Sequence, residues 1–362
     1  MANKFLELLK TRDWLLADGA TGTNLFEVGL QTGDAPELWN IDEPEKIYDL
    51  QKSFVDAGSD IILTNTFGGT RNRMKLHKAQ DRVVEINAAA VKITKRVADD
   101  AGRPVIVAGS MGPTGDIFEP VGTLSREEGI AAFREQAFAL AEAGADVLWL
   151  ETISAPEELE AAVTACSETG LPIVTTLSFD TNGRTMMGLT PADFARRVKA
   201  LSPVPVAYGA NCGVGASEMV TALQNMAMCA EEGDVLVSKS NCGIPEYVDG
   251  AIRYTGTPEL MAEYATIAID SGIKIVGGCC GTTPNHVKYM REALDNHTRG
   301  PKPSLDEIVS RLGEISNGAR AMNEAGPLGA KPEEPVTGGG RRRKGRDPKR
   351  KAADDGKFPG EV

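Results

Sequence analysis

Short apolar runs alternate with longer stretches of helical pattern along most of the chain. Each run is rich in Val, Ile and Leu, and the helical stretch after it often begins at Pro, Ser or Thr and ends near an Ala-Gly pair. The eight runs that we interpret as strands lie at 14–20, 60–67, 105–110, 146–152, 172–179, 206–212, 234–240 and 274–279. Helices are predicted in the gaps, for instance at 43–57, 126–143, 156–169, 191–201, 216–231, 258–271 and 284–296.

This alternation predicts parallel strands joined by right-handed helical crossovers, and eight such units favour a closed barrel. A doubly wound open sheet is the main alternative. It is disfavoured because the first strand leads into Asp18-Gly19-Ala20-Thr21-Gly22-Thr23 and not into a Gly-x-Gly-x-x-Gly turn. We therefore predict an α/β protein with a (β/α)8 TIM barrel at residues 1–300, a helical extension at 301–324 and a disordered basic tail at 325–362.

Charge separates the tail from the rest of the chain. Residues 341–362 hold nine Lys or Arg and four acidic residues, a charge of +5 within a total of −12. The remaining body is strongly acidic, which argues against nucleic-acid binding by the barrel. With few apolar residues the tail cannot offset its ordering entropy. Two interpretations stay open for it: a solvated appendage, or a tether to an anionic partner such as RNA, an acidic protein or a phospholipid surface.

Hydrophobicity and cysteine content indicate the compartment. The sequence has no apolar run of the length that spans a bilayer, and its first residues lack the apolar core of a signal peptide. Six cysteines are too few to form a disulfide framework in 362 residues, and a reducing compartment would keep them as thiols. We expect a cytoplasmic protein without a membrane segment.

Polar residues gather where the predicted strands end, which in a barrel is the face that carries function. These strand-end residues are Asp18, Asn65-Thr66, Ser110, Glu151-Thr152, Asn211-Cys212, Asn241-Cys242 and Cys279-Cys280. The last three strands are neighbours in a barrel and deliver thiols to one mouth. Three thiolates suit a catalytic zinc ion with one open position.

The third thiolate can come from either of two strand ends, whereas the Cys279-Cys280 pair supplies the first two. Adjacent residues of an extended strand point to opposite sides, but Gly277, Gly278 and Gly281 would let the backbone bend so that both cysteines reach one ion. Cys212 and Cys242 compete for the remaining position. Cys166 and Cys229 lie in helical patterns and are expected to serve packing.

Five motifs together resemble the zinc-dependent homocysteine S-methyltransferase family over about residues 10–296. That family includes betaine-homocysteine methyltransferase, enzymes that use S-methylmethionine and the N-terminal module of cobalamin-dependent methionine synthase. The motifs are Asp18-Gly-Ala-Thr-Gly-Thr23, Thr64-Asn-Thr-Phe67, Leu150-Glu-Thr152, Gly209-Ala-Asn-Cys-Gly213 and Gly277-Gly-Cys-Cys-Gly-Thr-Thr-Pro284. The resemblance independently implies a barrel.

The resemblance also implies roles for individual residues. Cys212, Cys279 and Cys280 would hold one Zn²⁺ per chain and serve catalysis, which places Cys242 outside the ligand set. The fourth ligand would be the homocysteine sulfur, kept as a nucleophilic thiolate. Asp18 and Glu151 would hold the substrate ammonium. Ser110 and Thr66 are weaker candidates for lining the substrate pocket.

The methyl donor is left open by the sequence. Gly68 stands where betaine-using relatives carry a tyrosine of an aromatic cage, and Trp39 does not clearly align with the family tryptophan. The Gly-Gly-Cys-Cys-Gly-Thr-Thr-Pro end resembles the methionine synthase module more. We therefore favour methylcobalamin on a separate cobalamin-binding protein, as in a split methionine synthase. Betaine or a related onium donor comes next, followed by S-methylmethionine or S-adenosylmethionine.

A different class of function is a zinc-binding module without turnover, which zinc analysis combined with a methionine-forming assay would distinguish from an enzyme. The oligomeric state is not determined by the sequence.

Overall fold

The computed structural model describes residues 3–248 and 251–327. Eight parallel strands form one sheet in the order β1-β10-β7-β6-β5-β4-β3-β2. They are β1 (Leu15–Leu16), β2 (Ile61–Leu63), β3 (Ile106–Met111), β4 (Val147–Ile153), β5 (Ile173–Leu177), β6 (Ala207–Cys212), β7 (Leu236–Ser240) and β10 (Ile275–Gly278). A parallel bridge between Ala17 and Ile61 joins the first strand to the second. The sheet is thereby closed into a TIM barrel, which confirms the predicted fold.

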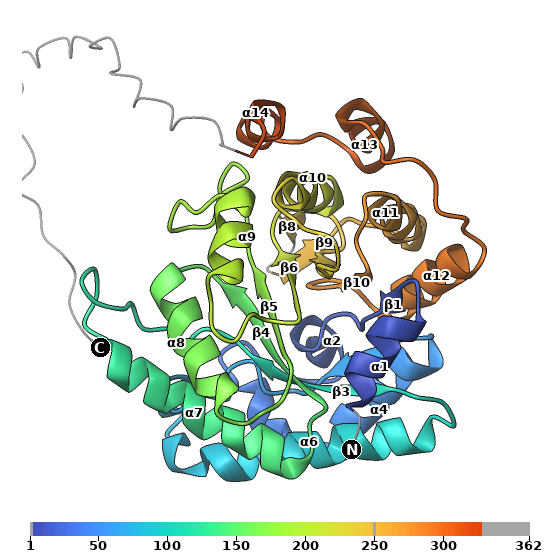
Figure 1. The fold of residues 1–362 in the computed structure, drawn as a ribbon. Coiled ribbons are helices and arrows are strands. Elements are labelled where there is room, and N and C mark those ends of the chain that lie inside the picture. Colours follow the sequence, from blue (N-terminus) through green and yellow to red (C-terminus); the bar gives the residue numbers. More distant parts are fainter. Residues whose placement is uncertain (1–2, 249–250, 328–362) are drawn as a thin grey trace, which may run out of the picture. The chain divides into compact units, whose positions relative to one another are not determined.

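Helices surround the strands (Figure 1). The main crossovers are α4 (Pro44–Asp56), α6 (Val83–Asp100), α7 (Arg126–Ala143), α8 (Pro156–Ser167), α9 (Pro191–Lys199), α10 (Ala216–Ala227), α11 (Pro258–Asp270) and α12 (Pro284–Asp295). Shorter pieces lie in the loops after the first two strands: α2 (Gly22–Glu27), η1 (Pro36–Leu38), α3 (Trp39–Asp42), α5 (Arg71–Lys75) and η2 (Gln80–Arg82).

Capping residues explain why the predicted helix bounds agree well with the observed ones. In α7 the Ser125 side chain accepts the backbone N–H of Glu128, while the Glu128 carboxylate accepts the N–H of Ser125. The helix ends at Gly144, whose φ of 103° is left-handed. Strands β3 and β4 have the predicted length, displaced by one residue, while the other strands are shorter than predicted, β1 and β2 most of all.

Side chains alternate in direction along each strand. Those that point inward are apolar at the base of the barrel and polar where the strands end. Leu15, Ile61, Ile106, Val147, Val174, Ala207, Val237 and Ile275 belong to one buried cluster. Because side chains alternate, residues two positions further along a strand face the same interior. Glu151 follows Trp149 in this way, and Lys239 follows Val237. The barrel interior is therefore apolar at its base and polar where the strands end.

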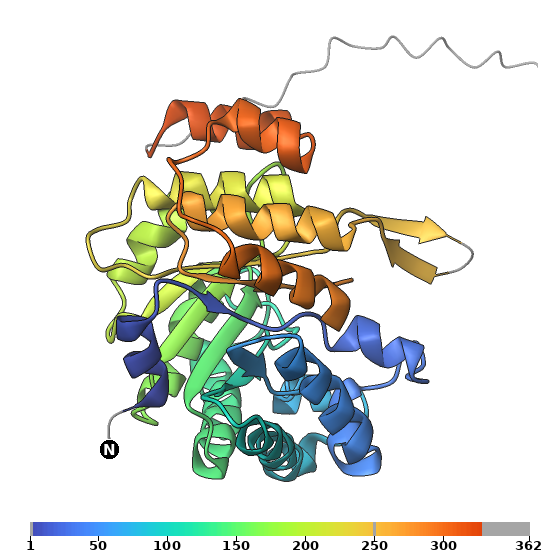
Figure 2. The ribbon, with the colours of Figure 1, turned by 90° about the vertical axis from the view of Figure 1, so that its right-hand side faces the viewer.

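Two features near the ends of the barrel were not predicted. Helix α1 (Lys4–Thr11) contributes Phe5 and Leu9 to the interior cluster and so closes the base. Strands β8 (Pro245–Val248) and β9 (Ala251–Tyr254) form a separate antiparallel pair between β7 and α11. This hairpin stands out from the barrel in Figure 2.

The predicted helical extension is present as α13 (Leu305–Leu312) and α14 (Asn317–Ala325). Both helices pack against α10. The Asn225 side chain of α10 donates to the backbone oxygen of Met322 at 3.1 Å, and Ser217 donates to that of Glu314 at 3.0 Å. The division into separate domains stays a prediction. From residue 328 onward, the predicted disordered tail lies outside the described residues.

Within residues 3–248 and 251–327, no helix combines the length and the apolar character that crossing a membrane requires.

Candidate active site

Three cysteines that are distant in the sequence come together where the strands end. Cys212 is the last residue of β6, and Cys279 and Cys280 directly follow β10. Their Sγ atoms all lie within 4.8 Å of one another, and each residue is partly exposed. With Zn–S distances of about 2.3 Å, the sulfurs of a tetrahedral zinc site are roughly 3.8 Å apart. The three thiols therefore fit a zinc ion that keeps one position for a further ligand.

An unusual backbone conformation places the first of these cysteines. Cys212 has a φ of 65°, in the left-handed region that residues with a side chain seldom adopt. Gly213 follows with a φ of 73°, so the chain turns sharply as it leaves β6. Such strain persists where the surrounding structure holds it, and it is concentrated at functional sites.

The glycines around the cysteine pair act differently from one another. Gly281 has a φ of 79°, and a Cβ there would also come 2.3 Å from Cγ of Tyr254. Gly277 and Gly278 instead continue β10, and a Cβ on Gly278 would lie 2.2 Å from Cγ2 of Thr282. Only Gly281 provides the expected left-handed bend. Gly278 is required because the chain packs closely against itself.

Asn241 connects the two strand ends that carry the thiols. Its Nδ2 donates to the backbone oxygen of Gly213 at 2.6 Å, and its Oδ1 accepts the N–H of Cys280 at 3.0 Å. The next residue, Cys242, is buried and its Sγ donates to the backbone oxygen of Gly256 at 3.2 Å. Cys242 therefore lies outside the thiol cluster. In this geometry Cys212, and not Cys242, is the third member of the thiol cluster.

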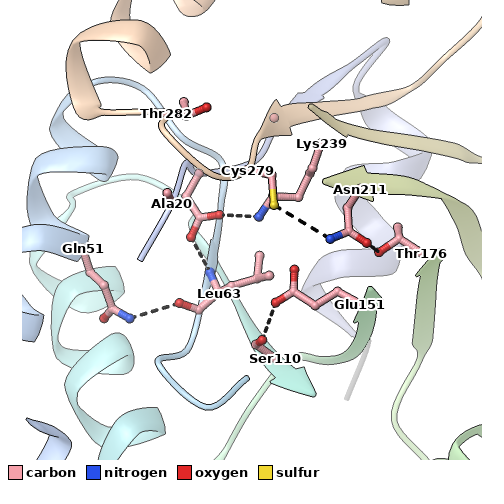
Figure 3. Close-up of polar contacts among 12 residues, drawn as sticks. Ala20, Gln51, Leu63, Ser110, Glu151, Thr176, Asn211, Lys239, Cys279 and Thr282 are labelled. Atoms are coloured by element: carbon pink, nitrogen blue, oxygen red, sulfur yellow. Dashed lines mark hydrogen bonds and ion pairs between the residues drawn. The ribbon is translucent and has the colours of Figure 1, made fainter. Parts of the chain in front are cut away.

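Asn211 links the end of β4 to the thiol cluster through its side chain. Its side chain exchanges two hydrogen bonds with Thr152, donating to Oγ1 at 2.7 Å and accepting from the backbone N–H at 2.8 Å. Thr152 has a φ of 62°, which for a β-branched residue costs on the order of 1–3 kcal/mol. The Asn211 Nδ2 also lies 3.9 Å from the sulfur of Cys279 (Figure 3). One amide thus holds both a strained strand end and a thiol.

The thiols lie close enough to influence one another's protonation. The contact with Cys279 raises the pKa of Cys212 to about 12, and the contact with Cys212 raises the pKa of Cys280 to about 11. The pKa of Cys279 is raised as well, since the Cys280 contact and burial outweigh the opposing effect of Cys212. Metal binding to these groups must displace protons, so the affinity for zinc should increase with pH.

A buried carboxylate lies deeper in the same mouth. The Ser110 hydroxyl donates to Oε1 of Glu151 at 2.5 Å, and burial raises the pKa of the Glu151 carboxyl. Thr66 lies beside them, but its hydroxyl already donates to the backbone oxygen of Ser110 at 2.7 Å. Glu151 is therefore the group that can accept a further hydrogen bond or ion pair, while the hydroxyls of Ser110 and Thr66 are used in hydrogen bonds within the protein.

Asp18 is paired within the protein. Its Oδ1 accepts from Nζ of Lys239 at 2.8 Å, and its Oδ2 accepts the N–H of Leu63 at 2.7 Å. Both charged side chains are 3% exposed. Burial lowers the pKa of Lys239, but Asp18 and Glu151 more than offset this, so the pKa is raised and the ammonium stays charged. The sequence interpretation did not include Lys239.

A single cavity of about 580 Å³ joins these groups. Its wall contains the three clustered cysteines together with Glu151, Lys239, Ser110 and Thr66. Further from the thiols it is lined by Phe26, Glu37, Phe67, Arg73 and His77. Ligand pockets commonly measure about 300–1,000 Å³, so the cavity can admit an amino acid and part of a second molecule.

Comparison with known proteins identifies the family. The sequence profile of homocysteine S-methyltransferase matches residues 15–294. The chain belongs to the homocysteine S-methyltransferase family. This confirms the resemblance seen in the five motifs.

Individual relatives agree with this homocysteine S-methyltransferase assignment. The chain is 29% identical over 317 residues to methionine synthase from Mycobacterium tuberculosis, a match that covers 82% of the chain and 26% of the relative. It thus spans about a quarter of that protein's length. In structure it resembles the homocysteine methyltransferase MmuM from Escherichia coli. The TM-scores are 0.65 for the metallated form and 0.64 for the oxidized form, each at 23% identity over 80% of this chain and 99% of the other.

In this family member the cavity wall contains Cys212, Cys279, Cys280, Glu151, Ser110 and Thr66, whereas Asp18 reaches the site only through its pair with Lys239. Sequence reasoning missed Lys239 and the supporting roles of Asn211 and Asn241, which it had noted only as strand-end residues. A signal for Lys239 existed, because a lysine inside the apolar run Leu236-Val-Ser-Lys-Ser240 faces the same side as Val237. The pairing with Asp18 had no such signal, since the two residues lie 221 positions apart.

Proposed function

We propose that this chain is a zinc-dependent homocysteine S-methyltransferase that forms methionine. The observation that carries the proposal is the convergence of Cys212, Cys279 and Cys280 on the same cavity as Glu151. The thiols suit a soft metal and the carboxylate suits an ammonium. Homocysteine carries a thiol and an ammonium a few bonds apart.

One ion per chain would be held by the three cysteines. When bound there, Zn²⁺ would lower the pKa of a substrate thiol that takes the fourth position and keep it as a thiolate at neutral pH. The residues of the chain perform the remaining tasks. Asn211 and Asn241 hold the thiol-bearing strand ends, and Glu151 with Ser110 receives the amino group.

Methyl transfer then needs alignment and no general base. The substrate sulfur attacks the methyl carbon in line, the S–C bond forms as the bond to the donor breaks, and the electron pair leaves with the donor group. Holding the amino acid at both its thiol and ammonium ends fixes the direction of attack, which is a proximity contribution to the rate.

For the donor we favour methylcobalamin carried by a separate protein. The support is the 29% identity to a methionine synthase, in which the matched region makes up 26% of the length. The betaine alternative lacks support from Trp39, which packs beside Leu25 and Ile47 under the Lys46 ammonium and does not line the cavity.

An onium donor, betaine or S-methylmethionine, is the second candidate because of one observation. The cavity is lined by a buried carboxylate, Glu37, and also by the aromatic rings of Phe26 and Phe67, the second of which has the Arg73 guanidinium 5.8 Å from its centroid. Glu37 accepts the Gly68 N–H at 2.6 Å, and burial raises the pKa of its carboxyl. A carboxylate and aromatic faces together attract a methylated cation.

The test measures zinc content and methionine formation on the same protein samples. Homocysteine is supplied with methylcobalamin, betaine, S-methylmethionine or S-adenosylmethionine in turn. We expect one zinc per chain and turnover with one donor class, and loss of both in Cys280→Ala. Turnover at the normal rate without bound zinc would contradict the mechanism. Stoichiometric zinc without methionine from any donor would favour the alternative of a zinc-binding module.

The described cysteines are free thiols, as the proposed chemistry requires. A reducing compartment preserves such thiols, and we propose the cytoplasm as the site of action.

A further inference from the structure

Lys239 is the one buried Lys or Arg among the described residues, and it lies in the substrate cavity. It projects from β7 into the polar end of the barrel. Figure 3 shows Lys239 of β7 and Glu151 of β4 near one another at the mouth, with Cys279 beside Lys239. The established family assignment gives this lysine no task.

The hydrogen-bond capacity of the lysine is incompletely used. An ammonium has three N–H donors, and in the described part of the chain Lys239 makes one hydrogen bond, to Asp18. Lys239 lines the cavity, whereas Asp18 does not. A buried donor without a partner is costly, roughly 1–3 kcal/mol, so the remaining donors favour an anionic ligand.

The charges at this end of the cavity are divided between two positions. Lys239 forms its ion pair with Asp18, while Glu151 lies within the electrostatic reach of that lysine without an ion pair of its own and, among the described residues, accepts only the Ser110 hydroxyl. A substrate ammonium that approached Asp18 would meet the positive charge of Lys239. At Glu151 it would meet a negative charge. The cavity therefore presents one positive and one negative group to an incoming zwitterion.

We propose that Lys239 binds the α-carboxylate of homocysteine while Glu151 binds the α-ammonium. Asp18 then acts on the substrate through Lys239, which it orients, and does not contact the ammonium as the family resemblance implied. This inference rests on the proposed function, because it takes homocysteine as the substrate.

The test is a calorimetric binding series on the zinc-loaded protein, which does not depend on turnover. The ligands are homocysteine, 3-aminopropane-1-thiol, which lacks the carboxylate, and 4-sulfanylbutanoate, which lacks the ammonium. In Lys239→Met we expect homocysteine binding to weaken about 10- to 100-fold, as for loss of a charged hydrogen bond. Binding of 3-aminopropane-1-thiol should change less than about threefold, since that ligand never made the contact.

Two further variants separate recognition from folding. Removing Lys239 leaves Asp18 as an unpaired buried charge, which is strongly destabilising, so Asp18→Asn/Lys239→Met removes both charges together. The double variant should show the same selective loss for ligands that carry a carboxylate. Glu151→Gln should give the mirror result, with binding of 3-aminopropane-1-thiol and homocysteine weakened and 4-sulfanylbutanoate little affected.

Each outcome decides between roles. Equal weakening of homocysteine and 3-aminopropane-1-thiol in the Lys239 variants would overturn the assignment of the carboxylate to Lys239. So would an Asp18→Asn variant that loses affinity for 3-aminopropane-1-thiol but keeps it for 4-sulfanylbutanoate, since Asp18 would then hold the ammonium itself. If the wild-type protein binds none of the three ligands, the proposed function fails, and this inference fails with it.

Discussion

At the residue scale, the same tripeptide serves two purposes in this chain. Asn-Cys-Gly ends β6 at residues 211–213 and recurs after β7 at 241–243. In the first copy the cysteine has a left-handed φ and its sulfur joins the cluster, whereas in the second the sulfur is buried against a backbone oxygen. The two asparagines both act as supports. Backbone conformation, and not residue type, selects the cysteine that joins the cluster.

Replacing each of these cysteines gives a matched pair of variants. Cys212→Ala removes one of three proposed ligands, so we expect loss of stoichiometric zinc and of methyl transfer. Cys242→Ala removes a buried thiol outside the cluster, so zinc should be retained and the cost limited to about 1–2 kcal/mol of stability from the lost volume and hydrogen bond. Metal analysis after gel filtration measures the difference. Zinc loss in Cys242→Ala would mean that this thiol contacts the ion.

At the element scale, the strands supply the chemistry while helices close and anchor the barrel. Helix α1 covers the base with Phe5 and Leu9, and so keeps water from the end opposite the cavity. Helix α12 begins directly after the cysteine loop and is capped by His286, whose Nδ1 accepts the N–H of Thr283 at 3.1 Å. The start of α12 therefore fixes where the Cys279-Cys280 loop ends.

Phe5→Ala tests the closure of the base. Phe5 is fully buried, so truncating it should reduce the free energy of unfolding by about 3–5 kcal/mol. Lys10→Ala on the same helix is the control, because its side chain is 72% exposed and pairs only with Glu7 at the surface. That substitution should cost less than about 0.5 kcal/mol. Urea unfolding of both variants gives the values, and equal effects would show that α1 does not seal the barrel.

The His286 cap predicts a dependence of stability on pH. Burial lowers the pKa of His286 below its ordinary value of 6.5 in the folded protein. The unfolded chain therefore binds a proton first as the pH falls, so the contribution is complete above about pH 6.5 and is lost as the pH falls through the lowered folded pKa. Protonation would also place a hydrogen on Nδ1, which could then no longer accept the hydrogen bond from the Thr283 N–H.

His286→Gln provides the comparison for this effect. A glutamine at the third helical position can still complete a capping box, but it does not titrate. Thermal unfolding midpoints between pH 5 and pH 8 should fall more steeply on the acid side for the wild-type protein than for the variant. Parallel curves would exclude His286 as the source.

At the scale of the whole molecule, the barrel depends on the helices that follow it. Residues of α10 are buried around most of the helix, including polar ones such as Gln224 and Asn225. Gln224 donates to the backbone oxygen of Pro303 at 2.9 Å, and α14 supplies the partner of Asn225. Buried polar groups require hydrogen-bond partners, and the extension supplies them for the polar side chains of α10.

Two truncations test this dependence. A chain that ends at residue 304 loses α13 and α14 and exposes the face of α10 that Ile308, Leu312 and Met322 cover. We expect its thermal midpoint to fall by several degrees or the protein to aggregate, since each buried aliphatic side chain contributes about 1.5–3 kcal/mol. A chain that ends at residue 327 keeps both helices and serves as the control. Equal midpoints for the two chains would show that the extension is dispensable.

The sequence by itself determined the succession of strands and helices, the closed barrel and the Cys279-Cys280 pair at its mouth. These features depend on periodicity and on motifs at strand ends, which are local properties of the chain. Only the tertiary structure decided which cysteine of the two Asn-Cys-Gly copies joins the cluster, and that Asp18 is paired with Lys239. Both outcomes depend on backbone dihedral angles and on contacts between residues far apart in the chain, and no local pattern records them.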